Sequence, residues 1–428
     1  MIDRRSVLKA GLAGAALPFA GRLVGEAQAQ SADLRLYWWG SQDRSKRTLA
    51  VADLFKAANP GLGASGEAVG ADYWPKLATM LVGRNLPDVI QFEPTTLPDY
   101  ARRSAMQELD PFLGKTIKTD QFAKGILDLG TVDGKVYGMA LGLNSFSMFY
   151  DADLFAKAGI APPKHGITWD EIARLAVEIG KAGGKERFWG ITNGARYNYV
   201  FDVWLHQRGK SLFTKDAQLG FTVDDAKEWY DYWEKVRLSG GAVGPDVQAQ
   251  DTHLIDSNPL TTGNTAMAFT FSNQLIGYQS VLKQKIGITT LPVAKADGPS
   301  GLYYRPALIW SIGKTSKQAE AAAKFIDFFV NSPEAGKILG VERGVPVNLA
   351  VRAQVAPLLN DLERQTVAYV DFIADKVGPY PAPVPLGANE FDHQVMRPTA
   401  DQLGFGKIKV AEAAERLVSE GKRVIRAS

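Results

Sequence analysis

The sequence predicts an α/β protein of two domains, each built on a doubly wound sheet flanked by helices. Short β-rich segments alternate along the chain with segments whose apolar residues recur at helical spacing, which is the pattern of open sheets covered by helices. The length of 428 residues and the hydrophobic content of 46% suit two domains of ordinary size.

The first elements follow this alternation. Residues 34–38 alternate in polarity and are rich in β-forming residues, so they predict a strand. Apolar residues at helical spacing follow over 48–58 and stop at Pro60, which predicts a helix that ends there. A further helix is expected over 73–81 and a short buried strand over 87–92.

The pattern restarts after a tight hairpin that Asp133-Gly134 predicts. Thr168-Trp169-Asp170-Glu171 has the form of a capping box, which predicts a helix that runs to about Lys181. Further strands are expected over 147–150, 265–271 and 286–291, and further helices over 222–236, 272–283, 316–330 and 411–425.

The N-terminus has the layout of an export signal. Arg4-Arg5 precede a short stretch of small apolar residues, in a form similar to the twin-arginine motif, from which Asp3 and Val7 depart. The small-x-small pattern that ends at Ala29 is typical of signal peptidase sites. We therefore expect residues 1–29 to be removed and the mature protein to be periplasmic.

Composition argues against several other functions. The chain contains no cysteine, and its four histidines lie far apart in sequence, so neither a disulfide nor a metal site is expected. The net charge of +3 is spread along the chain without a basic block, so no nucleic-acid partner is expected. No stretch is long and apolar enough for membrane insertion.

Two motifs with possible catalytic or cofactor roles have simpler interpretations. Residues 61–66 satisfy the dinucleotide pattern G-x-G-x-x-G, but they follow a helix end instead of a strand, so we expect a loop and no cofactor. The acidic pairs at 170–171 and 224–225 lie at predicted helix starts, where carboxylates cap free N–H groups. We therefore expect a protein that is not an enzyme.

A set of motifs recurs in a fixed order along the chain. It consists of Tyr37-Trp38-Trp39-Gly40 and residues 86–91 (LPDVIQ), 134–140 (GKVYGMA), 150–160 (YDADLFAKAGI) and 263–269 (GNTAMAF). Together these segments resemble the carbohydrate-binding subunits of bacterial ATP-binding-cassette importers, in the lineage of the maltose-binding proteins. The similarity covers nearly all of the mature chain, and its one notable departure is Asp151, where many relatives have Asn.

This resemblance implies the two-lobe periplasmic binding protein fold (type II), in which crossover strands form a hinge and a ligand lies between the lobes. Crossovers are expected near 141–144, 289–292 and 311–332. The expected division is 30–143 in lobe 1, 144–290 in lobe 2, 291–330 in lobe 1 and 331–428 in lobe 2. The implied partners are a carbohydrate and the membrane permease of the importer, and the protein is expected to be a monomer. Presentation of a ligand to a chemoreceptor and, with less support, a sugar-processing enzyme are the alternatives.

A carbohydrate site needs aromatic rings against sugar C–H faces and polar side chains for the hydroxyls. Ligands lie beyond the carboxyl ends of strands in open sheets, which favours Trp39 or its neighbour Trp38, together with Gln42, Glu93 and Asn144. Glu93 could instead cap a helix. The further candidates are Tyr73, Tyr197, Asn273, Tyr304 and Arg305, together with Phe391, where relatives have an aromatic cleft wall. Tyr73 could equally be core, and Arg305 could bind a carboxylate or donate hydrogen bonds to neutral hydroxyls.

Overall fold

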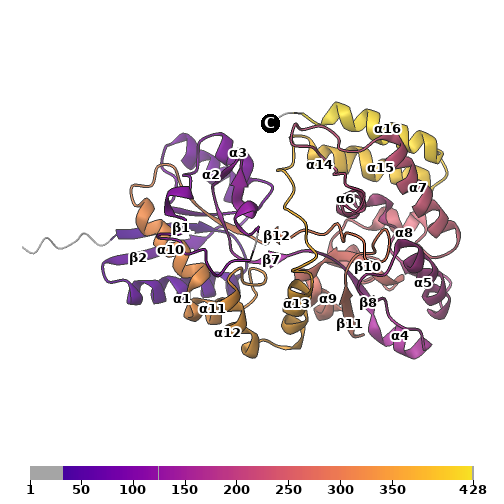
Figure 1. The fold of residues 1–428 in the computed structure, drawn as a ribbon, viewed down its shortest axis with the longest axis horizontal. Helices are drawn as coiled ribbons and strands as arrows, with labels where there is room; N and C mark the ends of the chain where they lie inside the picture. Colours follow the sequence, from indigo (N-terminus) through magenta and orange to yellow (C-terminus); the bar gives the residue numbers. More distant parts are fainter. Residues whose placement is uncertain (1–31, 124, 427–428) are drawn as a thin grey trace, which may run out of the picture.

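The computed structural model describes residues 32–123 and 125–426, so the expected export signal at 1–29 lies outside the described residues. The chain forms two lobes, each with its own sheet. Figure 1 shows the lobes side by side, with the short strands β7 (Leu143–Asn144) and β12 (Arg305–Pro306) between them.

The first lobe contains a mixed five-stranded sheet in the order β2-β1-β3-β13-β6. β1 runs parallel to β2 and β3, whereas β13 runs antiparallel to β3 and β6. The alternation of strands and helices predicts a parallel sheet, but β13 enters from the second lobe through β12 instead of from a helix. The strands are β1 (Ala32–Trp38), β2 (Leu62–Ala68), β3 (Val89–Phe92), β6 (Met139–Ala140) and β13 (Ile309–Ile312).

The glycine-rich segment forms β2, so the loop expected at 61–66 is wrong. A Cβ atom at Gly66 would lie 2.2 Å from the Leu36 carbonyl oxygen of the neighbouring strand. Glycine at this position therefore allows close approach of two strands, which is a structural reason for the pattern that involves no phosphate.

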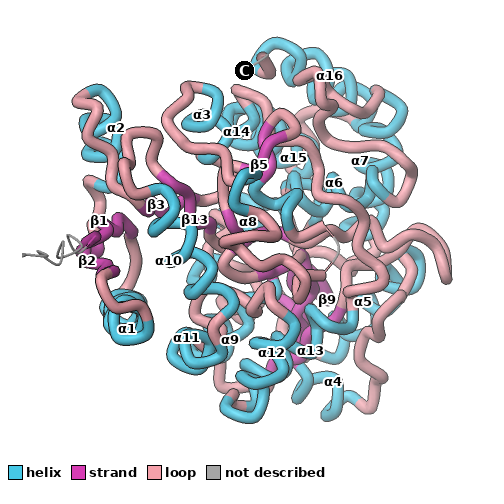
Figure 2. Tube along the Cα trace, turned by 60° about the vertical axis from the view of Figure 1, so that its left-hand side comes forward, coloured by secondary structure: helices cyan, strands magenta, loops and turns pink. Residues whose placement is uncertain are grey.

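Helices cover both faces of the first sheet. In Figures 1 and 2, α2 (Tyr73–Val82) and α3 (Leu97–Arg102) lie on one side, while α1 and α10 lie on the other. α1 (Gln42–Ala58) begins six residues before the expected range, because Ser41 caps it through the backbone N–H of Arg44. The remaining helices of this lobe are α10 (Ala319–Asn331), α11 (Pro333–Leu339) and α12 (Leu349–Val355).

The second lobe contains a four-stranded sheet in the order β11-β8-β10-β9. β8 runs antiparallel to both β10 and β11, and β9 runs parallel to β10. The capping box predicted at Thr168 and Glu171 is present at the start of α5. The strands are β8 (Phe146–Asp151), β9 (Trp189–Ile191), β10 (Thr265–Phe271) and β11 (Ile286–Thr289).

The helices of the second lobe come from two separate parts of the chain, and α16 packs against α7. They are α4 (Ala152–Ala158), α5 (Trp169–Ala182), α6 (Asn198–His206), α7 (Val223–Leu238), α8 (Pro245–Gln250), α9 (Leu275–Val281), α13 (Asp361–Phe372), α14 (Ala388–Glu390), α15 (Arg397–Gly404) and α16 (Val410–Val424). The predicted hairpin of Asp133 and Gly134 joins β4 (Thr131–Val132) to β5 (Lys135–Val136).

The crossovers lie at β7, at β12 and near residues 356–360. β7 agrees with the crossover expected at 141–144. The second crossover is at β12 instead of 289–292, because Val293 still pairs with the second lobe through Ile167 and Trp169. The third follows α12, because α11 packs on α1 and α12 in the first lobe while α13 packs on α9 and β11. The packing therefore places 291–304 in the second lobe and 333–355 in the first, in contrast to the expected division.

Candidate functional site

Two cavities lie between the lobes and share Pro94, Thr95 and Arg305. One, of about 380 Å³, is lined by the polar side chains of Glu93, Asn144, Asn273 and Arg343 together with the ring of Trp39, and we call it the polar cavity. The other, of about 220 Å³, is lined by Phe146, Tyr199, Phe271, Tyr303 and Tyr380, and we call it the aromatic cavity. Together they form the interlobe cleft.

Trp39 supplies the aromatic ring on the first-lobe side of the polar cavity. It follows β1 directly, and the alternation of the strand turns its neighbour Trp38 into the core, where Trp38 is fully buried. The ring of Trp39 packs against Tyr73 and Trp74, with ring centroids 4.7 and 5.4 Å apart. These contacts fix one side of the indole, while the residue also lines the cavity.

Glu93 follows β3 and lines the same cavity. Burial raises the pKa of its carboxyl group, against a smaller lowering by a hydrogen bond from Thr95. The carboxyl group therefore lies in a partly desolvated wall of the cleft. Thr96, three residues after Glu93, is the N-cap of α3, and no side-chain hydrogen bond caps that helix. The structure therefore does not show the alternative role of Glu93 as a helix cap.

A partly buried charge network lines the polar cavity and was not anticipated from the sequence. Arg44 Nε donates to Glu342 Oε1 over 2.6 Å, and Arg343 Nη1 donates to Glu342 Oε2 over 3.1 Å. Arg343 also donates to Thr48 Oγ1 and Gln91 Oε1, and burial lowers the pKa of its guanidinium to about 9. The donors of Arg343 are therefore largely committed to the first lobe.

Arg305 and Asn144 face the cleft from the hinge, where β12 and β7 pair them in register. The Arg305 guanidinium lies 4.8 Å from the ring centroid of Phe271 and 5.3 Å from that of Phe146. Within residues 32–123 and 125–426, neither an ion pair nor a hydrogen bond engages this guanidinium. The buried Oδ1 atom of Asn144 likewise has no hydrogen-bond partner.

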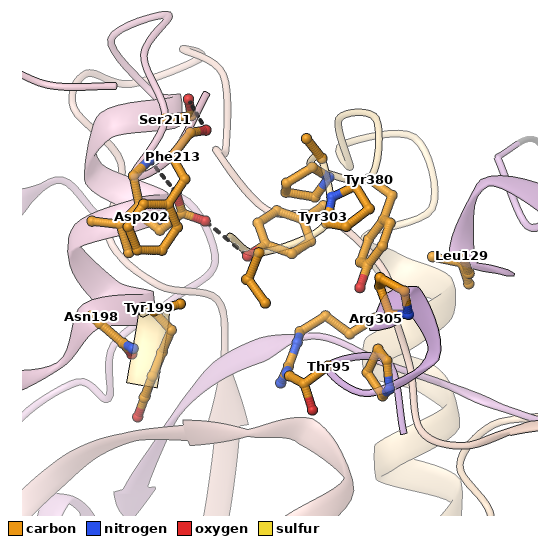
Figure 3. Close-up of a pocket in the computed structure, with 18 of the residues that line it drawn as sticks. Thr95, Leu129, Asn198, Tyr199, Asp202, Ser211, Phe213, Tyr303, Arg305 and Tyr380 are labelled. Carbon is orange, nitrogen blue, oxygen red and sulfur yellow. Dashed lines mark hydrogen bonds between the residues drawn. The ribbon is translucent and has the colours of Figure 1, made fainter. Parts of the chain in front are cut away.

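Several aromatic rings line the aromatic cavity, and Figure 3 shows those of Tyr199, Tyr303 and Tyr380. Tyr199 stacks on Phe146 with ring centroids 5.1 Å apart and an interplanar angle of 12°, and Tyr303 meets Phe146 edge-on with centroids 5.2 Å apart. The Tyr303 hydroxyl donates to Asp202 Oδ2 over 2.8 Å, and this hydrogen bond fixes the orientation of the Tyr303 ring. The ring centroid of Tyr380 lies 6.0 Å from that of Tyr303. These rings present apolar faces and hydroxyl groups to the same space.

Five of the ten expected residues line the cleft, and five do not. Trp39, Glu93, Asn144, Asn273 and Arg305 line the polar cavity. Tyr73 is core in the first lobe, where its hydroxyl donates to the Gln91 carbonyl oxygen over 2.6 Å. Gln42 is exposed at the first turn of α1, outside both cavities.

Tyr197, Tyr304 and Phe391 are buried in the second lobe away from the cavities. The Tyr197 hydroxyl donates to Asp251, and the Tyr304 hydroxyl donates to the Val370 carbonyl oxygen over 2.9 Å. Phe391 is fully buried against Phe213 and α16. The residues that line the cleft in their place are Tyr199, Tyr303 and Tyr380.

For Tyr303 and Tyr199, the sequence contains a signal, an aromatic residue close to a predicted site residue, but it does not distinguish the cleft from the core. Tyr303 directly precedes Tyr304 in extended chain, so the two side chains point to opposite sides, and the sequence does not say which side faces the cleft. Tyr199 lies in the first turn of α6 just after Tyr197, and an aromatic pair at such spacing is equally compatible with core packing. Tyr380 lies in a proline-rich segment without periodicity, which gave no sequence signal.

Across the part of the chain that the structure describes, no cluster of His, Asp and Glu has the arrangement of a metal site. The helices described there also lack the combination of length and apolarity that crossing a bilayer requires.

Comparisons with known proteins agree with this architecture. A binding protein of Brucella abortus (strain 2308), whose name states no ligand, is 26% identical over 307 residues, or 70% of this chain and 72% of that protein. The arabinooligosaccharide-binding protein of Bacillus subtilis (strain 168) is 25% identical over 61% of this chain and 60% of its own. A solved structure of an extracellular solute-binding protein family 1 member from Alicyclobacillus acidocaldarius superposes with a TM-score of 0.78 at 27% identity, over 92% of this chain and 98% of that one.

The family pattern of bacterial extracellular solute-binding proteins matches residues 39–336. This match confirms the resemblance seen in the sequence, and it agrees with the expectation of a binding protein and not an enzyme. Since the matched segment exceeds half of the chain, the protein belongs to the family of bacterial extracellular solute-binding proteins.

Proposed function

We propose that this protein captures a carbohydrate in the interlobe cleft and delivers it to the permease of an ATP-binding-cassette importer. The observation that carries the proposal is the composition of the cleft. Aromatic rings from both lobes line it together with polar groups, of which the Asn144 Oδ1 atom and the Arg305 guanidinium have no described hydrogen-bond partner. Sugar rings offer matching features, because their C–H faces pack on aromatic rings and their hydroxyls pair with amides and guanidinium groups.

The position of these groups supports capture by closure. Trp39 and Glu93 belong to the first lobe, Tyr199 and Phe271 belong to the second, and Asn144 and Arg305 lie on the hinge strands. A ligand that contacts all three regions favours the state in which the lobes approach each other, since it binds that state more tightly. The closed state would be the form that the permease recognises.

The relatives support a carbohydrate as the ligand. The similar Bacillus subtilis protein is named for an arabinooligosaccharide, and a second protein of that organism that is 25% identical is named for maltodextrin. Residues 1–29 have the form of an export signal, so we extend the proposal to a periplasmic location with cleavage near Ala29.

Calorimetric titration of the mature protein against mono-, di- and oligosaccharides tests the proposal. The panel includes neutral sugars, uronates and polyols, with amino acids and short peptides as ligands of another class. Saturable binding of one carbohydrate group that is weakened by Trp39→Ala is the expected result. Binding only of peptides or amino acids, or carbohydrate binding that Trp39→Ala leaves unchanged, would contradict it.

A further inference from the structure

We propose that Arg305 makes the cleft selective for carbohydrates that carry a carboxylate, such as uronate-containing saccharides. This inference rests on the proposed function, because it names the chemical class of ligand for the same cleft. Arg305 lines both the polar and the aromatic cavity. The described residues provide its guanidinium with cation–π contacts but with no hydrogen-bond acceptor.

Two of the three carboxylates that line the cavities accept hydrogen bonds from other residues of the protein. Glu342 accepts hydrogen bonds from Arg44 and Arg343. Asp202 accepts from the Tyr303 hydroxyl and from the Leu212 backbone N–H, each over 2.8 Å. Neither carboxylate forms a hydrogen bond or an ion pair with the Arg305 guanidinium.

Glu93 is the remaining acidic residue of the cleft wall. It lines the polar cavity together with Arg305, but no ion pair joins the two residues. The Glu93 carboxyl group instead accepts a hydrogen bond from Thr95. Burial raises the pKa of the Glu93 carboxyl group. An internal pair of Glu93 and Arg305 in the closed state is the competing explanation, and the experiment below separates the two.

The surroundings of Arg305 suit a carboxylate better than a hydroxyl. Phe271 and Phe146 lie against the guanidinium at 4.8 and 5.3 Å, and such contacts hold a planar group in one orientation. An oriented guanidinium presents two parallel N–H groups, which match the two oxygens of a carboxylate, whereas a hydroxyl can engage only one of them. Closure of the lobes would remove water, so an unbalanced charge left there would weaken the binding of a neutral ligand.

Asn144 supplies a second contact beside this group. It pairs with Arg305 across the β7–β12 ladder, and its buried Oδ1 atom has no partner among residues 32–123 and 125–426. A hydroxyl of the sugar ring next to the carboxylate can donate to this oxygen. The pair thus offers a guanidinium for the acid and an amide acceptor for the neighbouring hydroxyl.

The experiment is calorimetric titration with matched probes, namely di- and trigalacturonate, cellobiouronate, and the carboxyl-reduced neutral counterpart of each. We expect at least one acidic probe to bind more than tenfold tighter than its neutral counterpart. Arg305→Gln should weaken the acidic probe by about 100-fold and the neutral one by less than about fivefold. Arg305→Lys, which keeps the charge but loses the paired N–H groups, should fall between the wild type and Arg305→Gln.

Glu93→Gln is the control for the competing explanation. Under the proposal the wild-type protein already prefers the acidic probe over its neutral counterpart, whereas an internal pair of Glu93 and Arg305 predicts that this preference appears only in Glu93→Gln. If the Arg305→Gln protein does not fold, as judged by its thermal midpoint without ligand, the Arg305→Lys comparison decides.

The outcomes separate this inference from the proposed function. Equal affinity for acidic and neutral probes, or an equal loss of both in Arg305→Gln, would overturn the inference and leave carbohydrate capture standing. Preference for the neutral probe would do the same. Absence of binding by every carbohydrate, with a peptide or amino acid bound instead, would overturn the proposed function itself.

Discussion

Two arginines of the cleft wall, Arg343 and Arg305, have opposite relationships to the rest of the protein. Arg343 is 4% exposed and donates to Glu342, Thr48 and Gln91, all in the first lobe. Arg305 is only partly buried and lies against Phe146 and Phe271 without a described acceptor. A buried charge whose donors are satisfied internally supports the structure, whereas a charge left without an acceptor is available to a ligand.

The same contrast distinguishes the tyrosines. Tyr197 and Tyr304 are buried with hydroxyls that donate to Asp251 and to the Val370 carbonyl oxygen. Tyr199 presents a ring to the aromatic cavity, and its hydroxyl is not among the described hydrogen-bond donors. Residue type alone therefore does not separate binding residues from packing residues; the internal partners of each side chain do.

The largest expected effect is on Arg343. Arg343→Ala removes donors from Glu342, Thr48 and Gln91 in a buried site, so we expect the free energy of unfolding to fall by about 3–5 kcal/mol. Arg305→Ala should change it by less than about 1 kcal/mol, because no described ion pair or hydrogen bond is lost. Urea unfolding of both variants at pH 7 measures the difference. Equal destabilisation by the two substitutions would remove the distinction between them.

His253 extends the contrast to a partly buried group outside the cleft. Burial, with smaller contributions from Arg397 and Arg196, lowers the pKa of His253 to about 2, while an unfolded histidine titrates near 6.5. Below pH 6.5 the unfolded state therefore binds a proton that the folded state does not, and stability falls with decreasing pH. From pH 6.5 to 4.5 we expect a loss of about 2 kcal/mol from this residue.

His253→Asn is the matched control for this pH dependence. Asparagine tolerates the positive φ of 66° at this position, and it does not titrate. The buried Asp251 is retained in both proteins, so its contribution cancels in the comparison. Urea unfolding between pH 4.5 and 7 should show a flatter pH dependence in the variant; identical slopes would assign the acid sensitivity to other groups.

Substitutions at Tyr199 and Tyr197 should separate binding from stability. Tyr199→Ala removes a ring from the cavity wall, and we expect ligand affinity to fall by about 10- to 100-fold. Tyr197→Phe removes the hydroxyl that donates to Asp251 and should lower the free energy of unfolding by about 1–2 kcal/mol, with unchanged affinity. Calorimetric titration and urea unfolding of both proteins provide the two readouts. A loss of affinity in Tyr197→Phe would mean that the buried tyrosine positions the cleft.

The smallest effect is expected at the neighbouring pair Tyr303 and Tyr304. Each phenylalanine variant loses one hydrogen bond, to Asp202 or to the Val370 carbonyl oxygen, and should lose about 1 kcal/mol of stability. Only Tyr303→Phe should also alter ligand affinity, because Tyr303 lines the aromatic cavity. Equal affinities of the two variants would show that the Tyr303 hydroxyl does not orient its ring for binding.

Local signals in the sequence predicted most of the elements well. The capping box of Thr168 and Glu171, the hairpin at Asp133-Gly134 and the strand at 265–271 all lie where their patterns indicate. These features depend on hydrogen bonds and backbone angles within a few residues, so short stretches of sequence determine them. The helix of 272–283 is shorter in the structure, where a 3₁₀ turn precedes α9.

The sequence by itself determined that the chain forms strands alternating with helices, that it resembles solute-binding proteins, and that Trp39, Glu93 and Asn144 follow strands. Only the tertiary structure decided which aromatic side chains face the cleft, where β12 crosses between lobes, and that α11 packs on α1. The physical reason is the sequence distance over which the interactions act. Caps, turns and alternation depend on residues that are neighbours in the chain. The cleft is lined by residues as distant in sequence as Trp39, Asn144, Arg305 and Tyr380, and no local pattern predicts that they line the same cleft.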